Sequence, residues 1–385
     1  MISHKLNKLI IASFCLLIPL TGFSQSLAQR TSPRTMEGTR PQGMGGAFIA
    51  MDGTDENALF YNPAAINDFE DKIHMKFLLP SVNFSYKAIP FFSSDLTDLA
   101  DDIDAAGSDA AKVGVFNQFK TTNSGRYEEV GVHGSIANFM YKWVSAALFY
   151  DNSTIMGLLN PASSEITIDS VTTGGIQVGS AYSFFNDNLQ AGLAVKFVER
   201  YLISETVTQR DVIANAEFSD AFDFGQAGFG IGADIGIKGS IPWEAKAWKY
   251  LDPSFAITLQ DIGDTRFFAG DNVGRMEQSL SAGLALHPNF GKFKSNFALD
   301  FRDLDRRTDI ITKLHAGYEV ISPEISKVLR TISARIGTNQ GYLTGGLGFD
   351  FKYVQLNLAT YGKEIGQNTR QKQSRMFGAQ ISAGF

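Results

Sequence analysis

The sequence predicts an all-β fold: a transmembrane antiparallel β-barrel of about 14 strands, with one helical outer loop. Three observations predict it. The chain begins with an export signal, continues as repeated segments that alternate in polarity, and ends in one more such segment. Lipid-facing and lumen-facing side chains alternate along the strands of a membrane barrel, so the three observations support one another.

The export signal occupies the first residues. Lys5 and Lys8 give it a positive start, an apolar run continues to about Phe23, and Ser26 and Ala28 offer small residues for cleavage. The apolar run is short for a membrane-spanning helix, which needs about 20 residues, although an uncleaved anchor is the alternative. We therefore divide the chain into a signal peptide (1–28), an N-terminal segment (29–71) and a β-barrel (72–385).

Composition excludes several classes of protein. The only cysteine, Cys15, lies in the signal, so the mature chain would have no disulfide and no thiolate metal site. The formal net charge of −6 offers no basic face for nucleic acid. After the signal, no apolar run is long enough for a spanning helix, so a membrane form of this chain must be a closed barrel.

Alternation defines the wall of the predicted barrel. In residues 229–238 every second side chain is apolar, and residues 189–197 and 293–302 repeat the pattern. A helix would not keep a period of two. The opposite faces of these segments predict residues that line the lumen, either as a selectivity lining or merely to keep it polar: Lys196, Asp234, Lys238, Asp300 and Arg302.

The alternating segments number 14, an even count that puts both chain ends in the periplasm. They are 72–88, 126–139, 141–152, 165–184, 189–203, 225–239, 253–261, 276–287, 292–303, 312–320, 328–338, 341–351, 353–361 and 375–385.

Connection lengths fit this topology, with two exceptions. Long connections such as 89–125, 204–224 and 262–275 fall on the outer side, and short ones fall on the inner side, as in known barrels. The tight turn at 339–340 breaks the rule on the outer side, and the long connection 240–252 breaks it on the inner side. Trp243 and Trp248 in this connection predict either an anchor at the membrane interface or ordinary loop packing.

The last segment carries an expected assembly signal. Phe377, Ile381 and Phe385 share one face, and Phe385 ends the chain. A final amphipathic strand with a terminal phenylalanine resembles the signal read by the barrel-assembly machinery, which is therefore an expected partner. A soluble β-sandwich whose last strand ends in phenylalanine is the alternative.

A helical pattern interrupts the strands at residues 93–119. Leu96, Leu99 and Ile103 recur at helical spacing among aspartates, which predicts an acidic amphipathic helix. It is either a lid or collector over the outer mouth or, as we favour, a solvated helix at the barrel rim. The aspartates lack the spacing of a calcium loop.

Three glycines occur close together in the N-terminal segment. Gly43, Gly45 and Gly46 allow positive φ and close backbone approach. A phosphate-binding loop would require a preceding strand, a following helix and a Lys-Ser or Lys-Thr pair, and the sequence around these glycines has none of the three.

A fixed turn follows at Asn62, Pro63 and Ala64. Pro63 sets its own φ, and the Asn62 side chain is suited to bond nearby backbone. Together with the glycines, this turn resembles the start of the FadL-like outer-membrane barrels, which include long-chain fatty acid transporters and the PorV-type and TraF-like proteins. The resemblance implies that residues 29–71 form a hatch inside a 14-stranded barrel. Asn62, Pro63 and Ala64 would lie in this hatch, and Gly43, Gly45 and Gly46 would allow it to fold back on itself.

From the resemblance we expect a Gram-negative outer-membrane transport protein for hydrophobic or amphipathic small molecules such as long-chain fatty acids. Transporters of this type pass solutes through a side opening in the wall. The expected partners are outer-membrane lipids and a hydrophobic ligand. The alternative function is a PorV-like scaffold or shuttle in protein secretion and surface presentation, with secretion components as partners.

We expect neither an enzyme nor a metal protein. No serine lies in a recognisable nucleophile motif, so no catalytic residue is proposed. The histidines after the signal lack the His-x-x-x-His spacing of a helical zinc site, and two of them, His287 and His315, fall on lumen-facing positions. No cofactor is expected.

Overall fold

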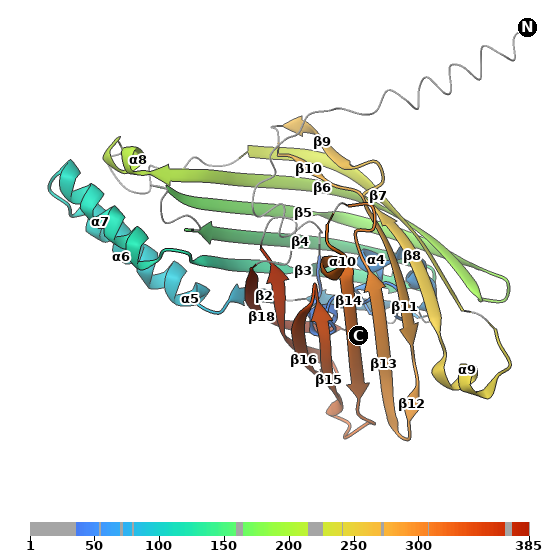
Figure 1. The fold of residues 1–385 in the computed structure, drawn as a ribbon. Coiled ribbons are helices and arrows are strands. Elements are labelled where there is room, and N and C mark those ends of the chain that lie inside the picture. The colour runs from blue at the N-terminus through green and yellow to red at the C-terminus, as the bar shows by residue number, and fades with distance from the viewer. Residues whose placement is uncertain are drawn as a thin grey trace, which may run out of the picture.

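The wall of the molecule is a closed antiparallel barrel of fourteen strands (Figure 1). The computed structural model describes residues 36–384 apart from 54, 70–71, 79–80, 159–164, 215–225, 241, 271–272, 307 and 366–371. The predicted signal peptide 1–28 and the terminal Phe385 lie outside the described residues. No helix within the described ranges is both long and apolar enough to cross a bilayer.

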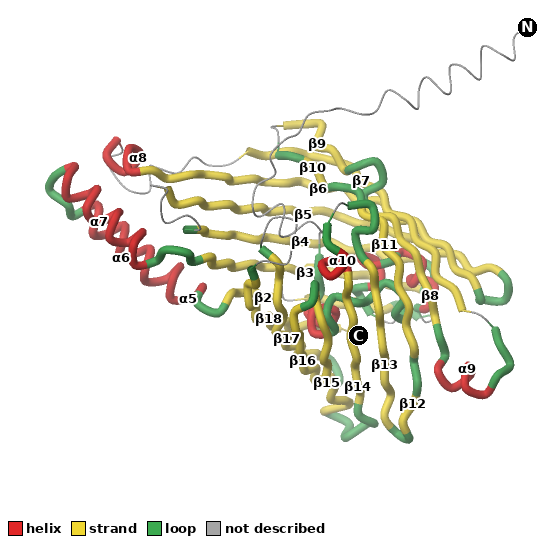
Figure 2. Tube along the Cα trace, in the orientation of Figure 1, coloured by secondary structure: helices red, strands yellow, loops and turns green. Residues whose placement is uncertain are grey.

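Some wall strands are built from more than one segment (Figure 2). Strand 1 comprises β1 and β2, strand 7 comprises β8 and β9, and strand 8 comprises β10, β11 and β12. The segments are β1 (His74–Leu78), β2 (Ser81–Ser85), β3 (Tyr127–Tyr141), β4 (Val144–Gly157), β5 (Glu165–Phe184), β6 (Leu189–Thr208), β7 (Gln226–Ser240), β8 (Ser254–Gln260), β9 (Thr265–Gly270), β10 (Arg275–Met276), β11 (Ser279–Leu286), β12 (Asn289–Phe290), β13 (Phe293–Phe301), β14 (Leu314–Ile321), β15 (Leu329–Asn339), β16 (Tyr342–Phe351), β17 (Val354–Glu364) and β18 (Gln373–Gly384).

The barrel closes between its first and last strands. β18 pairs with β1, where Lys76 lies opposite Gly384, and with β2, where Phe84 lies opposite Phe377. The predicted count of strands and the closed antiparallel architecture are therefore confirmed. On β18, Ile381 is 45% exposed and points away from the lumen, on the same face as the half-buried Phe377.

Alternation gives the wall two chemically different faces. The outward positions carry exposed apolar side chains, which is the surface that a bilayer covers. Examples are Ile176, Val178, Leu193, Phe197, Ile231, Ile235, Ile237, Ile257, Leu347 and Ile381. The inward positions of the same strands carry buried polar and small side chains such as Gln177, Ala194 and Lys238.

Helices gather mainly at one end of the barrel, which we call the loop end (Figure 1). The connection between β2 and β3 contains α5 (Ala88–Pro90), η2 (Phe91–Asp95), α6 (Leu96–Asp104) and α7 (Asp109–Thr122). α8 (Gln209–Ala214) follows β6 and α10 (Ile310–Lys313) precedes β14. The opposite end, the turn end, has one helix between β7 and β8, α9 (Lys246–Leu251).

The helical connection corrects one prediction. Residues 93–119 form the end of η2, all of α6 and most of α7 instead of one helix. Gly107 lies between α6 and α7, and the Ser108 side chain accepts a hydrogen bond from Ala111 N–H (3.3 Å) at the start of α7. Leu99, Ile103 and Phe116 pack against Ile166 of β5 and Val207 of β6. Ile166 and Val207 alternate in phase with lipid-facing residues, so the helices cover the outside of the projecting strand tips.

The structure also corrects several strand boundaries. β4 continues to Gly157 and β6 to Thr208, each about five residues past the predicted end, because these tips pack against helices and lose the alternation of a lipid-facing wall. Residues Thr265–Gly270, placed in the outer connection 262–275, form β9. Residues 261–264 leave the strand between β8 and β9, and we call them the excursion. They interrupt the alternation, so the second half of strand 7 was not predicted.

Candidate functional site: a hatch held inside the barrel

Residues 36–69 lie inside the barrel and form the hatch. They contain α3 (Thr39–Gly43), α4 (Ala58–Tyr61) and the 3-10 helix η1 (Pro63–Asp68). Most of their side chains are buried, and together with inward alanines of the wall they make the main hydrophobic core of the molecule. The barrel lumen is therefore filled by the chain's own N-terminal segment.

The Asn-Pro-Ala turn begins η1. The Asn62 side chain accepts a hydrogen bond from Ala64 N–H (3.0 Å), the local bond that the sequence predicts, and donates one to Ile49 O (3.0 Å). Pro63 takes the first position of the 3-10 helix, where its missing N–H costs nothing. The turn thus ties two separate parts of the hatch together.

Two glycines reverse the chain after α3. Gly45 has φ +70° and Gly46 has φ +79°, whereas Gly43 lies within α3. A Cβ on Gly45 would stand 2.3 Å from Thr338 O, and one on Gly317 would stand 2.2 Å from Met44 O. Hatch and wall backbones therefore touch directly, which only glycine permits.

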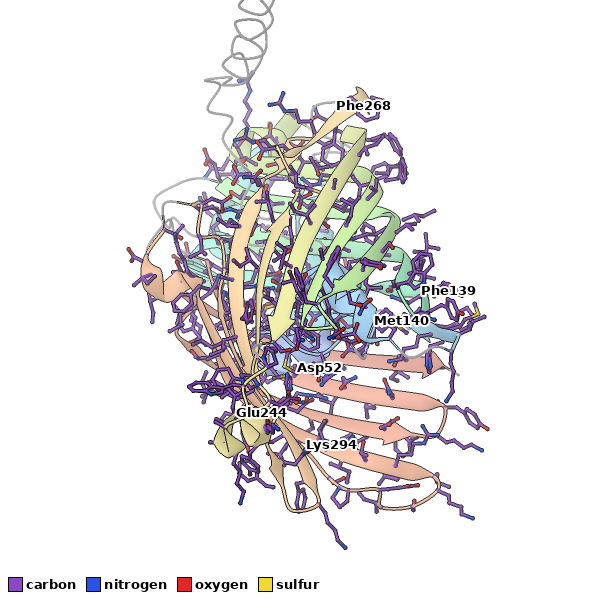
Figure 3. The ribbon with its side chains drawn as sticks, turned by 90° about the vertical axis from the view of Figure 1, so that its right-hand side faces the viewer. Asp52, Phe139, Met140, Glu244, Phe268 and Lys294 are labelled. Carbon is purple, nitrogen blue, oxygen red and sulfur yellow. The ribbon has the colours of Figure 1, made fainter. Side chains whose placement is uncertain are left out.

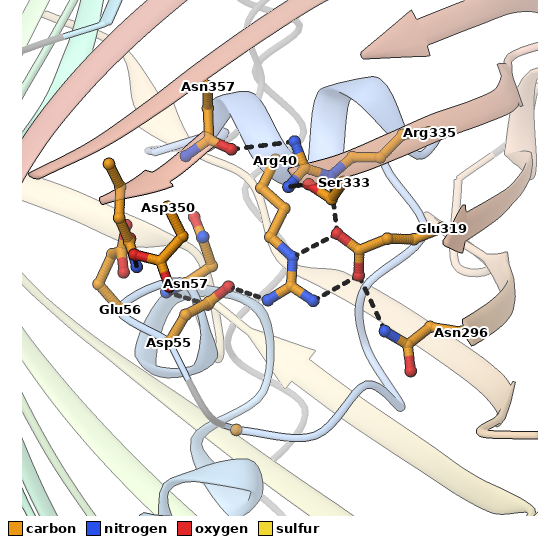
Figure 4. Close-up of polar contacts among 12 residues, drawn as sticks. Arg40, Asp55, Glu56, Asn57, Asn296, Glu319, Ser333, Arg335, Asp350 and Asn357 are labelled. Atoms are coloured by element: carbon orange, nitrogen blue, oxygen red, sulfur yellow. Dashed lines mark hydrogen bonds and ion pairs between the residues drawn. The ribbon is translucent and has the colours of Figure 1, made fainter. Parts of the chain in front are cut away.

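Arg40 is the most connected residue of the hatch (Figure 4). Its Nε and Nη2 donate to Glu319 of β14 (3.0 and 2.6 Å), and its Nη1 donates to Asp55 (2.5 Å). Arg335 of β15 donates to the same Glu319 (2.7 Å). Burial lowers the pKa of Arg40, but Glu319 and Asp55 outweigh it and hold the pKa above its ordinary value. The cluster is a charge-assisted network that joins hatch to wall.

A second ionic contact fixes the middle of the hatch. Lys238 of β7 bonds Asp68 (2.6 Å) and Asp52 (3.1 Å) through its Nζ. Burial raises the pKa of Asp52, yet Lys238 and His287 outweigh this and keep the pKa below its ordinary value. Asp52 is thus charged at neutral pH and holds the hatch to strands β7 and β11.

The other charged wall residues contact the hatch by different means. Asp300 Oδ2 accepts hydrogen bonds from the backbone N–H groups of Phe48 (2.6 Å) and Ile49 (3.0 Å). The Arg302 guanidinium lies 5.0 Å from the centre of the Tyr61 ring, a cation–π geometry. These contacts hold the two ends of the apolar part of the hatch.

Lys196 and Asp234 form a third cluster where strand 7 is interrupted. Lys196 Nζ lies 3.0 Å from Asp234 Oδ1 and 2.7 Å from Asp261 Oδ1. Asp261 N–H donates to Asp234 Oδ1 (2.8 Å), which fixes the first residue of the excursion. The neighbouring Gln260 side chain donates to Phe60 O (2.5 Å), so the interrupted strand contacts α4 of the hatch.

The excursion adds three residues to strand 7. Ile235 of β7 lies opposite Leu259, while Gly230, five positions away, lies opposite Phe267, eight positions away. Residues 261–264 lie within this stretch and turn partly outward, with Ile262 40% exposed. Because the insertion is odd, inward positions are even-numbered before it, as at Thr258, and odd-numbered after it, as at Thr265. A register shift between Phe267 and Ala269 adds a fourth residue.

Below the hatch, toward the turn end, two cavities whose lining includes charged side chains adjoin each other. The larger has a volume of about 420 Å³ and is lined by residues that include Asp68, Phe69, Lys76 and Arg330. The smaller has a volume of about 230 Å³ and reaches the Arg40–Glu319 cluster. Lys76 borders both, where it pairs with Glu56 of the hatch (2.7 Å).

The predicted lumen residues all face inward and are all buried. Lys196, Asp234, Lys238, Asp300 and Arg302 are at most 4% exposed. Lys238, Asp300 and Arg302 contact the hatch, and Lys196 and Asp234 contact each other. Among the described residues no group of three or more His, Cys, Asp and Glu has the arrangement of a metal site.

Sequence reasoning missed the residues that hold the hatch most firmly: Arg40, Asp55, Glu319 and Arg335. Glu319 and Arg335 do occupy lumen-facing positions of alternating segments, so that signal was present for both. Arg40 and Asp55 lie in the irregular hatch, where the sequence has no strand or helix periodicity from which a contact with the wall could be predicted.

Fold and site together define a class: a transmembrane antiparallel β-barrel whose lumen is filled by its own N-terminal hatch. The chain is similar to the FadL-like superfamily of outer-membrane barrels, as its N-terminal motif indicates. No protein-family model matches the sequence, and no curated protein matches it.

The chain is similar to several solved structures at low identity. The TodX monoaromatic hydrocarbon channel deltaS2 mutant has a TM-score of 0.48 and 13% identity, covering 90% of this chain and 97% of that one. The Pseudomonas putida toluene transporter TodX has a TM-score of 0.46 and 11% identity, covering 91% and 98%. A Pseudomonas aeruginosa FadL homologue has a TM-score of 0.46 and 10% identity, covering 91% and 99%.

Proposed function

We propose that this chain is a transport protein of the Gram-negative outer membrane for hydrophobic or amphipathic small molecules, such as long-chain fatty acids. The observation that carries the proposal is the hatch. Its buried apolar interior and its ionic contacts with the wall fill the lumen. A general porin keeps a water-filled channel, whereas a filled lumen suits solutes that bind the protein before they pass.

The proposed route leaves the barrel sideways at strand 7. There Gln260 donates a hydrogen bond to Phe60 O of α4 (2.5 Å), so the hatch is in contact with the interrupted strand. A solute that displaces α4 would reach the wall at the point where the pairing of β7 with strand 7 is interrupted. The route delivers an apolar solute to the bilayer without crossing the two cavities below the hatch.

Native mass spectrometry of the barrel, purified gently from its own outer membrane, tests the function directly. We expect a bound mass that matches a fatty acid or another apolar molecule. A bound protein without any small ligand would overturn the proposal in favour of a scaffold in protein secretion.

Uptake assays test the role of the hatch separately. A variant that lacks residues 36–69 is compared with the full chain for uptake of fatty acid and of a small polar dye. We expect loss of saturable fatty acid uptake together with gain of dye leakage. Normal fatty acid uptake by the variant would contradict the proposed role of the hatch.

A further inference from the structure

The connection between β7 and β8 contains a helix that buries none of its side chains against the rest of the protein. α9 has six residues, and none of them is buried. Helices this short are not stable alone in water, because nucleation costs more than a few hydrogen bonds return. An external surface that covers α9 would explain why the helix persists there.

One face of α9 is apolar. Ala247, Trp248 and Leu251 fall on one side at helical spacing, while Lys246 and Lys249 lie on the other. Trp243, which precedes the helix, packs on Trp248 with ring centres 5.5 Å apart and is itself 61% exposed. Two large aromatic rings thus extend the apolar face beyond the helix.

The contacts of Tyr250 place α9 on the outside of the wall. The Tyr250 ring meets the Phe290 ring at 6.3 Å. Phe290 lies opposite Phe293, whose position alternates in phase with the lipid-facing Phe297. α9 therefore stands beside the lipid-facing surface and away from the lumen.

Other turns at the same end carry exposed aromatic side chains. Trp143 is 49% exposed between β3 and β4, Phe185 is 76% exposed between β5 and β6, and Tyr353 is 59% exposed between β16 and β17. Figure 3 shows Glu244 of the α9 connection toward the same end as Lys294 and far from Phe268 of the loop end. Aromatic side chains collect in this way at the boundary between lipid and water.

We propose that α9 and Trp243 form an interfacial anchor, which inserts its apolar face among the phospholipid headgroups of the leaflet at the turn end. The lipid-facing surface of the wall reaches the helix through Phe293, Phe290 and Tyr250, and Tyr250 lies between Lys246 and Ala247 at the edge of the apolar face. Lys246 and Lys249 are long enough to reach phosphate groups from the opposite face of the helix. The inference rests on the barrel spanning a membrane and does not depend on what it transports.

Tryptophan fluorescence in proteoliposomes tests the anchor. The chain has three tryptophans, so the double variant Trp143→Phe/Trp248→Phe leaves Trp243 as the only reporter. We expect phosphatidylcholine brominated near the headgroup to quench Trp243 more than phosphatidylcholine brominated near the chain end. A matched reference, Gln118→Trp on the exposed side of α7 with all three native tryptophans changed to Phe, is expected to respond only to aqueous acrylamide.

Two results would overturn the proposal. One is Trp243 emission that responds to acrylamide as strongly as the reference and does not respond to brominated lipid. The other is emission that depends on the ratio of protein to lipid but not on bromination, which would mean that a second copy covers α9. Folding of each variant is confirmed by its heat-dependent migration on gels, and neither readout requires transport.

Discussion

Arg40 bonds the hatch to Glu319 of β14, which Arg335 of β15 also contacts, so the Arg40→Ala variant is the sharpest single test of the site. Asp55 would lose its ion pair with Arg40, and Glu319 would keep only Arg335 and Asn296. Removing one member of a buried ion pair costs about 3–5 kcal/mol. We expect the hatch to loosen and the ion conductance of single barrels in planar bilayers to rise.

The matched control is Lys249→Ala, which removes an exposed ion pair with Glu244 on α9. Exposed pairs contribute about 0–1 kcal/mol, so conductance is expected to stay at the level of the unmodified protein. Equal conductance in both variants would show that Arg40 does not hold the hatch closed.

Gly45 provides a test of close packing at the same site. Gly45→Ala adds a methyl group 2.3 Å from Thr338 O at a residue with φ +70°, so the hatch must shift. Gly291→Ala is the control, because its φ is +63° and nothing stands within 4 Å of the new methyl group. The left-handed backbone alone costs about 1–2 kcal/mol. We expect faster hydrogen exchange throughout the hatch only for Gly45→Ala, and equal exchange would contradict the contact.

The sequence predicted which way these residues point but not what they touch. Alternation was enough to place Lys238 and Asp300 in the lumen, because neighbouring side chains on a strand face opposite sides. Their partners, Asp68 and Phe48, are 170 and 252 positions away along the chain. Such pairings depend on the path of the hatch backbone inside the barrel. The hatch sequence has no regular alternation of polarity, so this path could not be predicted from it.

At the scale of elements, strand 7 shows why periodicity alone was insufficient. Residues 254–260 alternate clearly, but the sequence Asp-Ile-Gly-Asp at 261–264 has the composition of a turn. It was therefore predicted to begin a loop, and β9 beyond it was missed. The excursion is held by Asp261 through Lys196, a contact that requires strand 5 to be in place.

Deleting residues 261–264 tests the proposed side route. The deletion removes as many residues as the excursion and the bulge between Phe267 and Ala269 add together, so β7 would pair with one continuous strand that lacks both. We expect a folded barrel whose uptake of hydrophobic solute falls by about tenfold or more, equivalent to at least about 1.4 kcal/mol. Ile262→Ser, which keeps the length and changes one partly exposed side chain, serves as the control. Undiminished uptake by the deletion variant would exclude this route.

For the whole molecule, strand count and closure were predictable because each strand repeats the same two-faced pattern. We expect the loop end to lie outside the cell and the turn end in the periplasm, because the long connections are at the loop end. The projecting tips of β4–β6 were not predictable, since helices replace lipid on their outer face.

Cysteine labelling tests this orientation without interference, because Cys15 is the only cysteine and lies in the predicted signal. Gln118→Cys on α7 and Glu244→Cys beside α9 both change exposed residues. In intact cells a membrane-impermeant maleimide is expected to label the first, and to label the second only after the outer membrane is permeabilised. The reverse pattern would invert the topology.

The small inward side chains of the wall have a consequence for assembly. Gly192, Gly236 and Gly317 leave space that hatch residues occupy, and inward alanines such as Ala194 and Ala298 do the same. A wall of this kind has too little side-chain volume to fill its own interior. We therefore expect the N-terminal segment to be the template around which the later strands close, so that the last hydrogen bonds between β18 and strand 1 enclose a core that is already in place.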